Sequence, residues 1–251
     1  MTAKKLTRQE LNFLTSLQKR QQRYERKLFL IEGTHLVKEA LQQDYPLHEI
    51  FFYQNHMTKD TYQLIEKAEK KNIHIRPVDS YCLERISTTK TPQPLVAVAP
   101  LPETNYPVTG SALYFYKIND PGNLGTIMRT ALWYGIDHLI LSPESCDPFN
   151  TKTVRASQGA IFSIRLTCDR DISTLVSMAE NYQILVSNPN EKNFPHVEDK
   201  FITIFGSESQ GMKNIKCVFK HQRFGIKRKG AGESLNLAVA VGIFLDRVRG
   251  D

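Results

Sequence analysis

The sequence has few of the features that mark secreted, metal-binding or membrane-spanning proteins. Its four cysteines are far apart and form no C-x-x-C or cysteine–histidine metal spacing, so we expect reduced, mostly buried thiols and no metal site. The start of the chain is polar and basic without an apolar signal core, and no apolar run is long enough to cross a bilayer. The expected location is therefore the cytoplasm.

The glycine patterns of common nucleotide-binding folds are also missing. There is neither the G-x-G-x-x-G fingerprint of dinucleotide-binding folds nor the G-x-x-x-x-G-K-[ST] pattern of a P-loop. A nicotinamide-dependent oxidoreductase is therefore disfavoured.

Acidic residues are outnumbered, with 26 Asp+Glu against 33 Lys+Arg and a formal net charge of +7. This excess favours a polyanionic partner, nucleic acid first and an anionic membrane second, although charge alone can also serve solubility. Basic residues are densest in residues 1–30, which include Arg26 and Lys27 and contain only two acidic residues, Glu10 and Glu25. The density favours contact with a polyanion over an ordinary solvated surface.

Strands and helices alternate over the first hundred residues, which predicts a small α/β domain. The expected strands are 28–31, 50–53, 73–78 and 95–99, and the expected helices are 7–20, one capped by Thr34, 59–71 and 80–86. Residues 87–94 form a polar, proline-stiffened loop that is a candidate substrate contact. The proline-rich stretch 100–110 predicts a linker, which gives domains 1–103 and 104–251.

The alternation restarts in the second half and predicts a mostly parallel sheet covered by helices. Strands are expected at 112–118, 138–141, 161–166, 183–186 and 201–205, and helices up to residue 134, near 150–157 and at 172–181.

Four junctions in this half combine glycine with polar or charged side chains, and ligands gather at such strand ends in α/β sheets. The junctions are 119–129, 154–160, 206–211 and 223–240. Each is weak alone: Arg129 could be a surface arginine, Arg155 a cap, and Glu208 a charge at a helix N-terminus.

The last junction runs from a short apolar segment through Lys227, Arg228 and two glycines into a helix expected to open at Glu233 or Ser234. The helix is apolar over most of its circumference, which predicts burial. The pattern fits a ligand site held by a rigid anchor, or a purely structural loop-to-helix junction.

In order and spacing, three of these junctions resemble the motifs of the SpoU (TrmH) family of RNA ribose 2′-O-methyltransferases, within the SPOUT superfamily. The resemblance rests on NDPGNLGTIMRTA at 119–131, FGSESQGM at 205–212 and ESLNLAVA at 233–240, and it covers roughly residues 110 to 251. The first half resembles an L30e-like substrate-binding domain through FLIEG at 29–33 and TKTP at 89–92.

The resemblance implies a deep C-terminal trefoil knot, a homodimer with the site near the subunit interface, and S-adenosylmethionine as cofactor. Periodicity alone predicts an unknotted, doubly wound sheet. By motif position, the implied cofactor contacts are Gly206, Ile226 and Leu235, and the implied catalytic set is Asn123, Arg129, Glu208, Ser234 and Asn236. The candidate RNA contacts are Arg26, Lys27, Lys90, Arg155, Lys227 and Arg228.

These residue types suit methyl transfer to a ribose 2′-OH, which is a poor nucleophile. Because a guanidinium stays protonated, Arg129 is expected to stabilise the developing alkoxide and a neighbouring phosphate. Ser234 and Asn236 would orient substrate and loop, and Glu208 would position a partner group. No metal is needed.

One departure from the family pattern concerns Ile226, which is followed by Lys227 and Arg228 where related sequences usually carry Pro-Met. The change frees the backbone beside the cofactor and offers two cations to RNA phosphates. The expected substrate is structured RNA, with 23S ribosomal RNA favoured and tRNA second. The competing interpretation is a non-catalytic RNA-binding member of the fold.

Overall fold

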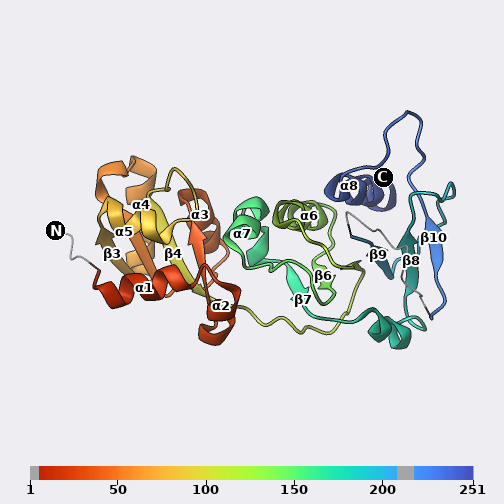
Figure 1. Ribbon diagram of the computed structural model, residues 1–251, viewed down its shortest axis with the longest axis horizontal. Coiled ribbons are helices and arrows are strands. Elements are labelled where there is room, and N and C mark those ends of the chain that lie inside the picture. The colour runs from red at the N-terminus through yellow and green to blue at the C-terminus, as the bar shows by residue number, and fades with distance from the viewer. Residues whose placement is uncertain (1–5, 208–217, 251) are drawn as a thin grey trace. The chain divides into compact units, whose positions relative to one another are not determined.

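The computed structural model describes residues 6–207 and 218–250, and the chain folds into two compact units (Figure 1). The first unit comprises residues 1–102 and 147–162, and the second comprises residues 103–146 and 163–251. Within the described ranges, no helix is both long and apolar enough to cross a membrane. Among the described residues, Cys82, Cys146 and Cys168 form no disulfide.

The first unit contains a four-stranded sheet in the order β1-β4-β2-β3, in which only the β2–β3 pair is parallel. The strands are β1 (Leu28–Glu32), β2 (Glu49–Tyr53), β3 (His74–Val78) and β4 (Leu95–Pro100). The helices are α1 (Arg8–Ser16), α2 (Arg20–Arg26), α3 (Thr34–Gln42), α4 (Lys59–Lys70), α5 (Ser80–Ile86) and α7 (Thr151–Ser157), with short 3-10 turns η1 (Gln54–His56) and η2 (Ala160–Phe162).

The core of the first unit follows from the alternation of side chains along its strands. Leu30 and Phe51 lie in one apolar cluster with residues of α1 and α5. Phe29 points to the other face, where its ring lies 5.4 Å from that of Phe149, centroid to centroid. Residues 147–162, which the sequence pattern assigns to the second half, thus supply part of this core.

The second unit contains a six-stranded sheet in the order β10-β8-β9-β5-β6-β7, and every neighbouring pair is parallel. The strands are β5 (Ala112–Phe115), β6 (His138–Leu141), β7 (Arg165–Thr167), β8 (Gln183–Ser187), β9 (Phe201–Phe205) and β10 (Gln222–Phe224). The helices are α6 (Pro121–Trp133) and α8 (Leu237–Arg249), with a 3-10 helix η3 (Ile172–Met178). The expected α/β architecture with a mostly parallel sheet is confirmed.

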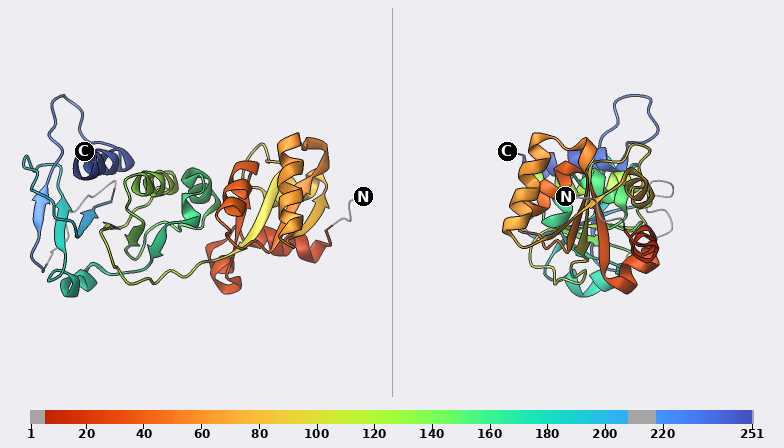
Figure 2. Two further views of the ribbon diagram at one scale, coloured as in Figure 1. Left: turned by 180° about the vertical axis from the view of Figure 1, so that it is seen from behind. Right: turned by 90° about the vertical axis from the view of Figure 1, so that its left-hand side faces the viewer.

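Helices α6 and α8 lie side by side against this sheet in the two opposite views of Figures 1 and 2. Phe244 anchors α8 because its ring packs 4.8 Å from Phe224 and 5.8 Å from Phe205, measured between centroids. The two helices approach each other closely at Gly242, where an added Cβ would lie 3.7 Å from the Thr130 methyl, an ordinary van der Waals distance.

Several sequence expectations differ from the structure at element boundaries. The strand expected at 161–166 is the turn η2 followed by the short β7, and the helix expected at 172–181 is the 3-10 helix η3. The last helix begins at Leu237, later than expected, because the Asn236 side chain accepts hydrogen bonds from the backbone N–H groups of Ala238 and Val239. Its predicted burial is wrong on one face, where Val239 is 50% exposed.

Candidate active site

The candidate site lies at the carboxyl edge of the parallel sheet in the second unit. Because all six strands are parallel, their carboxyl ends share one edge. The chain runs outward from β5 through β6 to β7, then returns to build β8 and β9 on the other side of β5. β5 and β9 therefore flank the topological switch point, where α/β sheets bind ligands. The Tyr116 N–H donates to the Phe205 carbonyl at 2.9 Å and joins the loops that leave these strands.

The first motif leaves β5 and opens α6 at this edge. Asp120 caps the helix by accepting a hydrogen bond from the Asn123 backbone N–H at 2.8 Å, and Pro121 occupies the first helical position. Asn123 is thereby fixed in the first turn of α6. Arg129 lies further along the same helix and is exposed.

The third motif meets the first through a pair of asparagines. The Asn236 side-chain N–H donates to the Asn123 side-chain oxygen at 2.9 Å, although the two residues are 113 positions apart. The Asn236 oxygen meanwhile accepts from Ala238 N–H at 2.9 Å, so one side chain both caps α8 and holds α6. The N-termini of the two helices are consequently fixed together at the sheet edge.

The remaining predicted site residues are less tightly held. Ser234 and Leu235 are exposed, and neither Ser234 nor Arg129 makes a side-chain hydrogen bond within the part of the chain that the structure describes. Gly206 and Ile226 are half-buried at the ends of β9 and β10. Glu208 lies outside the described residues.

The loop between β10 and α8 begins at a glycine that the packing requires. A Cβ on Gly225 would fall 1.9 Å from the Glu191 carbonyl oxygen, so no larger residue fits beside that backbone. Beyond it Lys227 and Arg228 are exposed, and the Arg228 guanidinium donates to the Gly232 carbonyl at 3.2 Å.

A set of large apolar side chains on α6, on α8 and just before α8 is exposed, although the sequence pattern predicted that the α8 members would be buried. Its four members, hereafter the apolar stripe, are 40–85% exposed: Trp133, Leu235, Val239 and Ile243. Leu235, Val239 and Ile243 follow one another at intervals of four, which places the two helical ones on one face of α8. Sequence patterning detects an apolar face but does not say whether the chain itself covers it.

The predicted RNA contacts of the first unit are spread over several elements. Lys90 and Lys27 are exposed, and the Arg26 guanidinium lies over the Phe13 ring at 5.6 Å. Arg155, on α7, donates to the Thr88 hydroxyl at 2.8 Å and approaches the Glu32 carboxylate at 3.4 Å. Glu32 is buried and was not singled out from the sequence, because its partners are distant in the chain.

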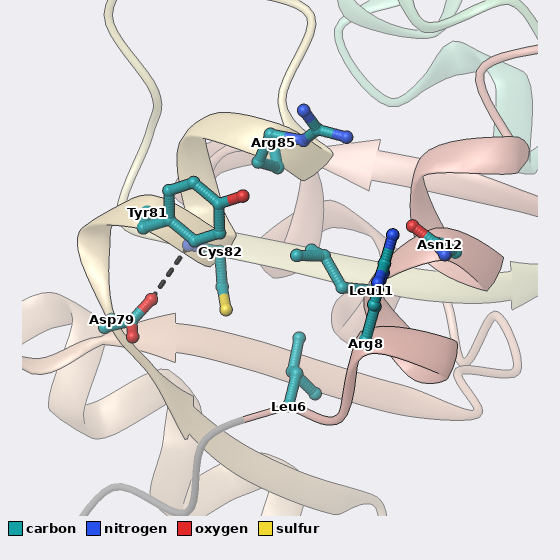
Figure 3. A pocket seen from close by; sticks show the side chains of 8 residues that line it. All are labelled: Leu6, Arg8, Leu11, Asn12, Asp79, Tyr81, Cys82 and Arg85. Atoms are coloured by element: carbon teal, nitrogen blue, oxygen red, sulfur yellow. Dashed lines mark hydrogen bonds between the residues drawn. The ribbon is translucent and has the colours of Figure 1, made fainter.

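A cavity of about 560 Å³ opens beside α1 and α5 in the first unit (Figure 3). It is lined by Leu6, Arg8, Leu11, Asn12, Asp79, Tyr81, Cys82 and Arg85. Tyr81 is 60% exposed, and neither Arg8 nor Arg85 forms an ion pair with a described residue. The cavity thus presents a free aromatic ring and two free cations.

His138 is the buried titratable group with the clearest shift. It lies on β6, is fully buried, and shares a 2.8 Å hydrogen bond with the Thr167 hydroxyl. Burial, aided by the positive charge of Arg165, lowers the pKa of His138 to about 4. The imidazole is therefore neutral at physiological pH. In the described ranges, no group of three or more His, Cys, Asp or Glu side chains could hold a metal ion.

The fold and the site define an α/β protein with its functional edge at the switch point of a parallel sheet. A model of the SpoU rRNA Methylase family matches residues 110–246, more than half of the chain. A model of the MRM3-like substrate binding domain matches residues 9–97. The chain belongs to the SpoU rRNA methylase family, as the three motifs predicted.

Known proteins agree with this assignment over nearly the whole chain. The 23S rRNA (guanosine(2553)-2′-O)-methyltransferase RlmP of Bacillus subtilis is 30% identical, with 93% of each chain covered. The solved structure of a TrmH-family protein from Porphyromonas gingivalis is 29% identical, with a TM-score of 0.77 and 98% of each chain covered. The SpoU methyltransferase AviRb from Streptomyces viridochromogenes, solved with AdoMet, shares the fold at a TM-score of 0.82, with 19% identity and 98% of each chain covered.

Proposed function

We propose that this protein is an S-adenosylmethionine-dependent methyltransferase that modifies a ribose 2′-OH of ribosomal RNA, with 23S rRNA as the first candidate. The observation that carries the proposal is the Asn236–Asn123 hydrogen bond of 2.9 Å, which joins two family motifs at the switch point of the sheet. The name of the Bacillus subtilis relative, a 23S rRNA 2′-O-methyltransferase, supports the choice of substrate.

The sheet edge fits the cofactor that the family uses. Gly206 offers backbone groups without a side chain in the way, and half-buried Ile226 offers an apolar surface of the kind that packs against an adenine ring. Leu235, at the other end of the same loop, can close over it. When bound, S-adenosylmethionine supplies an electrophilic methyl group on a sulfonium.

The chain's own residues would align and activate the ribose. Arg129 stays cationic and would stabilise the charge that develops on the 2′-oxygen, together with an adjacent phosphate. Asn123 and Asn236 hold each other and would fix the nucleotide by hydrogen bonds, while Ser234 and Glu208 would order the surrounding loops. The roles of these five residues are proposals.

We further propose that the protein acts as a homodimer through the apolar stripe. Trp133 of α6 and three aliphatic side chains of α8 and its lead-in segment are exposed, and α6 packs on α8. Water solvates such apolar side chains poorly, and a second copy would present the same ones for self-complementary pairing. The stripe begins at Leu235, a proposed cofactor contact, so pairing would also order the site.

The C-terminal trefoil knot is part of the same proposal. After β9 the chain reaches β10 at the far edge beyond β8, then returns in α8 to pack on α6. The C-terminal segment thus goes to the β10 edge of the sheet and returns across the switch point between β9 and β5. A threaded C-terminal segment requires such a path.

The first unit would select the RNA, with residues 1–103 as the substrate-binding domain and 104–251 as the catalytic domain. The match to a substrate-binding domain model supports this role. Its cavity exposes Tyr81, Arg8 and Arg85, side chains of the type that stack on unpaired bases and hold phosphates. Arg26, Lys27 and Lys90 in this domain would add cations, as would Arg155, whose segment 147–162 packs into the same compact unit. Lys227 and Arg228 in the second unit would add two more, and the protein would work in the cytoplasm.

The experiment is transfer of labelled methyl from S-adenosylmethionine to RNA purified from cells that lack this gene. We expect label in one RNA species with the wild type, and a loss of at least about a hundredfold in kcat with Arg129→Ala. Lys67→Ala, which removes an exposed cation from α4, is the matched control and should leave the rate unchanged.

RNA binding without transfer by the wild type would contradict the proposal and favour a non-catalytic RNA-binding member of the fold. Label in tRNA with none in rRNA would contradict the choice of substrate.

A further inference from the structure

The first unit buries a carboxylate at the end of its edge strand. The Glu32 side chain is 1% exposed, and each of its oxygens receives hydrogen bonds. Oε2 accepts from the Ser87 hydroxyl at 3.0 Å, and Oε1 accepts from the Thr88 N–H at 3.1 Å and the Thr88 hydroxyl at 3.0 Å. The start of the loop at residues 87–94 is therefore attached to β1 by its backbone and by two hydroxyl groups.

The same carboxylate also orients Arg155. One guanidinium nitrogen of Arg155 lies 3.4 Å from Glu32 Oε2 and donates to the Thr88 hydroxyl oxygen at 2.8 Å. The Thr151 hydroxyl, one turn earlier on α7, lies 2.9 Å from that same oxygen. The other guanidinium nitrogens of Arg155 make no hydrogen bond within the described residues, and the side chain is 31% exposed. One guanidinium nitrogen of Arg155 is thus fixed by Thr88 and Glu32, and the other nitrogens can donate hydrogen bonds to a ligand.

The loop itself is stiffened beyond Thr88. The Thr89 N–H donates to the Ser87 hydroxyl at 3.1 Å, and the Thr89 hydroxyl donates to the Thr91 carbonyl at 3.0 Å. Lys90, between these anchored positions, is exposed. Half-buried Arg155 and exposed Lys90 thus both place a cation near residues that Glu32 holds by hydrogen bonds.

A buried ion pair is a poor way to gain stability, because desolvating the charges offsets most of their attraction. Fixing the geometry of cations is a better account of this network. We propose that Glu32 is a positioning residue for RNA, which holds Arg155 and the Lys90 loop in the arrangement that meets a backbone phosphate. This inference rests on the proposed function, because it assumes that the first unit binds RNA.

Neutralising Glu32 can either strengthen or weaken RNA binding, and the direction of that change separates the positioning role from the alternatives. Removing a negative charge from an RNA-binding surface should by itself strengthen binding to a polyanion. If Glu32 positions Arg155, Glu32→Gln should instead weaken binding, since the cations lose their arrangement. Glu66→Gln, which removes an exposed carboxylate from α4, is the matched control for the charge effect alone.

The experiment measures the affinity of the full-length protein for ribosomal RNA from cells lacking the gene, over a range of salt concentrations. We expect Glu32→Gln and Arg155→Ala each to weaken binding roughly tenfold and to reduce the slope of log affinity against log salt by roughly one phosphate contact. In the Arg155→Ala background, Glu32→Gln should weaken binding much less, because the arginine it orients is gone. Thr88→Val should weaken binding and Thr88→Ser should restore it, which tests the network if Glu32→Gln does not fold.

Binding by Glu32→Gln that equals or exceeds that of the wild type would overturn the proposal, as would fully additive losses in the double variant. Because RNA affinity is measured without methyl transfer, this outcome is distinguishable from failure of the proposed enzyme activity. S-adenosylmethionine binding, a property of the second unit, should be unchanged in every one of these variants.

Discussion

At the scale of single residues, we expect His138 to make the folded protein less stable in acid. His138 is buried next to Thr167 and has a pKa of about 4, well below its ordinary value of 6.5. Between pH 6.5 and pH 4 the His138 imidazole is protonated in the unfolded chain but stays neutral in the folded chain. The free energy of unfolding therefore decreases as the pH drops from about 6.5 to 4. The full loss is about 3 kcal/mol, from 1.36 kcal/mol per pKa unit.

Urea unfolding at a series of pH values tests this expectation. His138→Asn should lose less stability than the wild type between pH 6.5 and 4, because the variant has no imidazole to titrate. His56→Gln, at an exposed histidine, should follow the wild-type curve. Parallel curves for the wild type and His138→Asn would show that His138 is not the acid-sensitive group.

A second residue-scale prediction concerns Arg23 and Asp147, which form a buried ion pair in the first unit. Arg23 is 2% exposed and also donates to the Leu17 and Gln18 carbonyls, each at 2.8 Å. Removing only the carboxylate leaves a buried cation unpaired, so Asp147→Ala should cost about 3–5 kcal/mol in the free energy of unfolding.

The double variant Arg23→Met with Asp147→Ala should recover part of that loss, because no unpaired charge remains. Denaturant unfolding of the single and double variants measures both effects. An equal loss in the two proteins would mean that the cost comes from packing and not from charge.

At the scale of elements, the exposed face of α8 predicts self-association. Val239→Glu puts a charge in the middle of the apolar stripe and should convert a dimer into a monomer, as measured by sedimentation. Val176→Glu, on exposed η3, introduces the same charge outside the stripe and should leave the dimer intact. A wild-type monomer at micromolar concentration would contradict the proposed assembly.

Some elements follow directly from the sequence, and others do not. Strands such as 138–141 and 201–205 were predicted to the residue, because a buried parallel strand reads as an uninterrupted apolar run. The start of α8 was expected at Glu233 or Ser234, because the local sequence does not show that the Asn236 side chain both caps the helix and contacts Asn123. The three motifs identified the family because their order and spacing are specific even where each alone is weak.

Long-range partners are what the sequence could not reveal. Glu32 meets Ser87 across 55 residues and Arg155 across 123, and no local pattern encodes either meeting. Residues 147–162 likewise belong to the first unit by packing, although they stand between strands of the second. An apolar helix face, finally, looks the same in sequence whether its own chain or a second copy covers it.

At the scale of the whole molecule, a basic unit that would hold structured RNA is joined to a parallel-sheet unit that would methylate it. The first half matches a substrate binding domain model and the second half matches the SpoU rRNA Methylase family model. In the proposed reaction the methyl group goes to a ribose oxygen and not to a base.

The chemical stability of the labelled product tests that claim most directly. A 2′-O-methyl group blocks alkaline cleavage of the adjacent phosphodiester, because the hydroxyl that attacks the phosphorus is no longer free. After transfer from labelled S-adenosylmethionine and complete alkaline hydrolysis of the RNA, we predict that the label appears in an alkali-stable dinucleotide from 23S rRNA. Label in a mononucleotide would place the methyl group on a base and contradict the account.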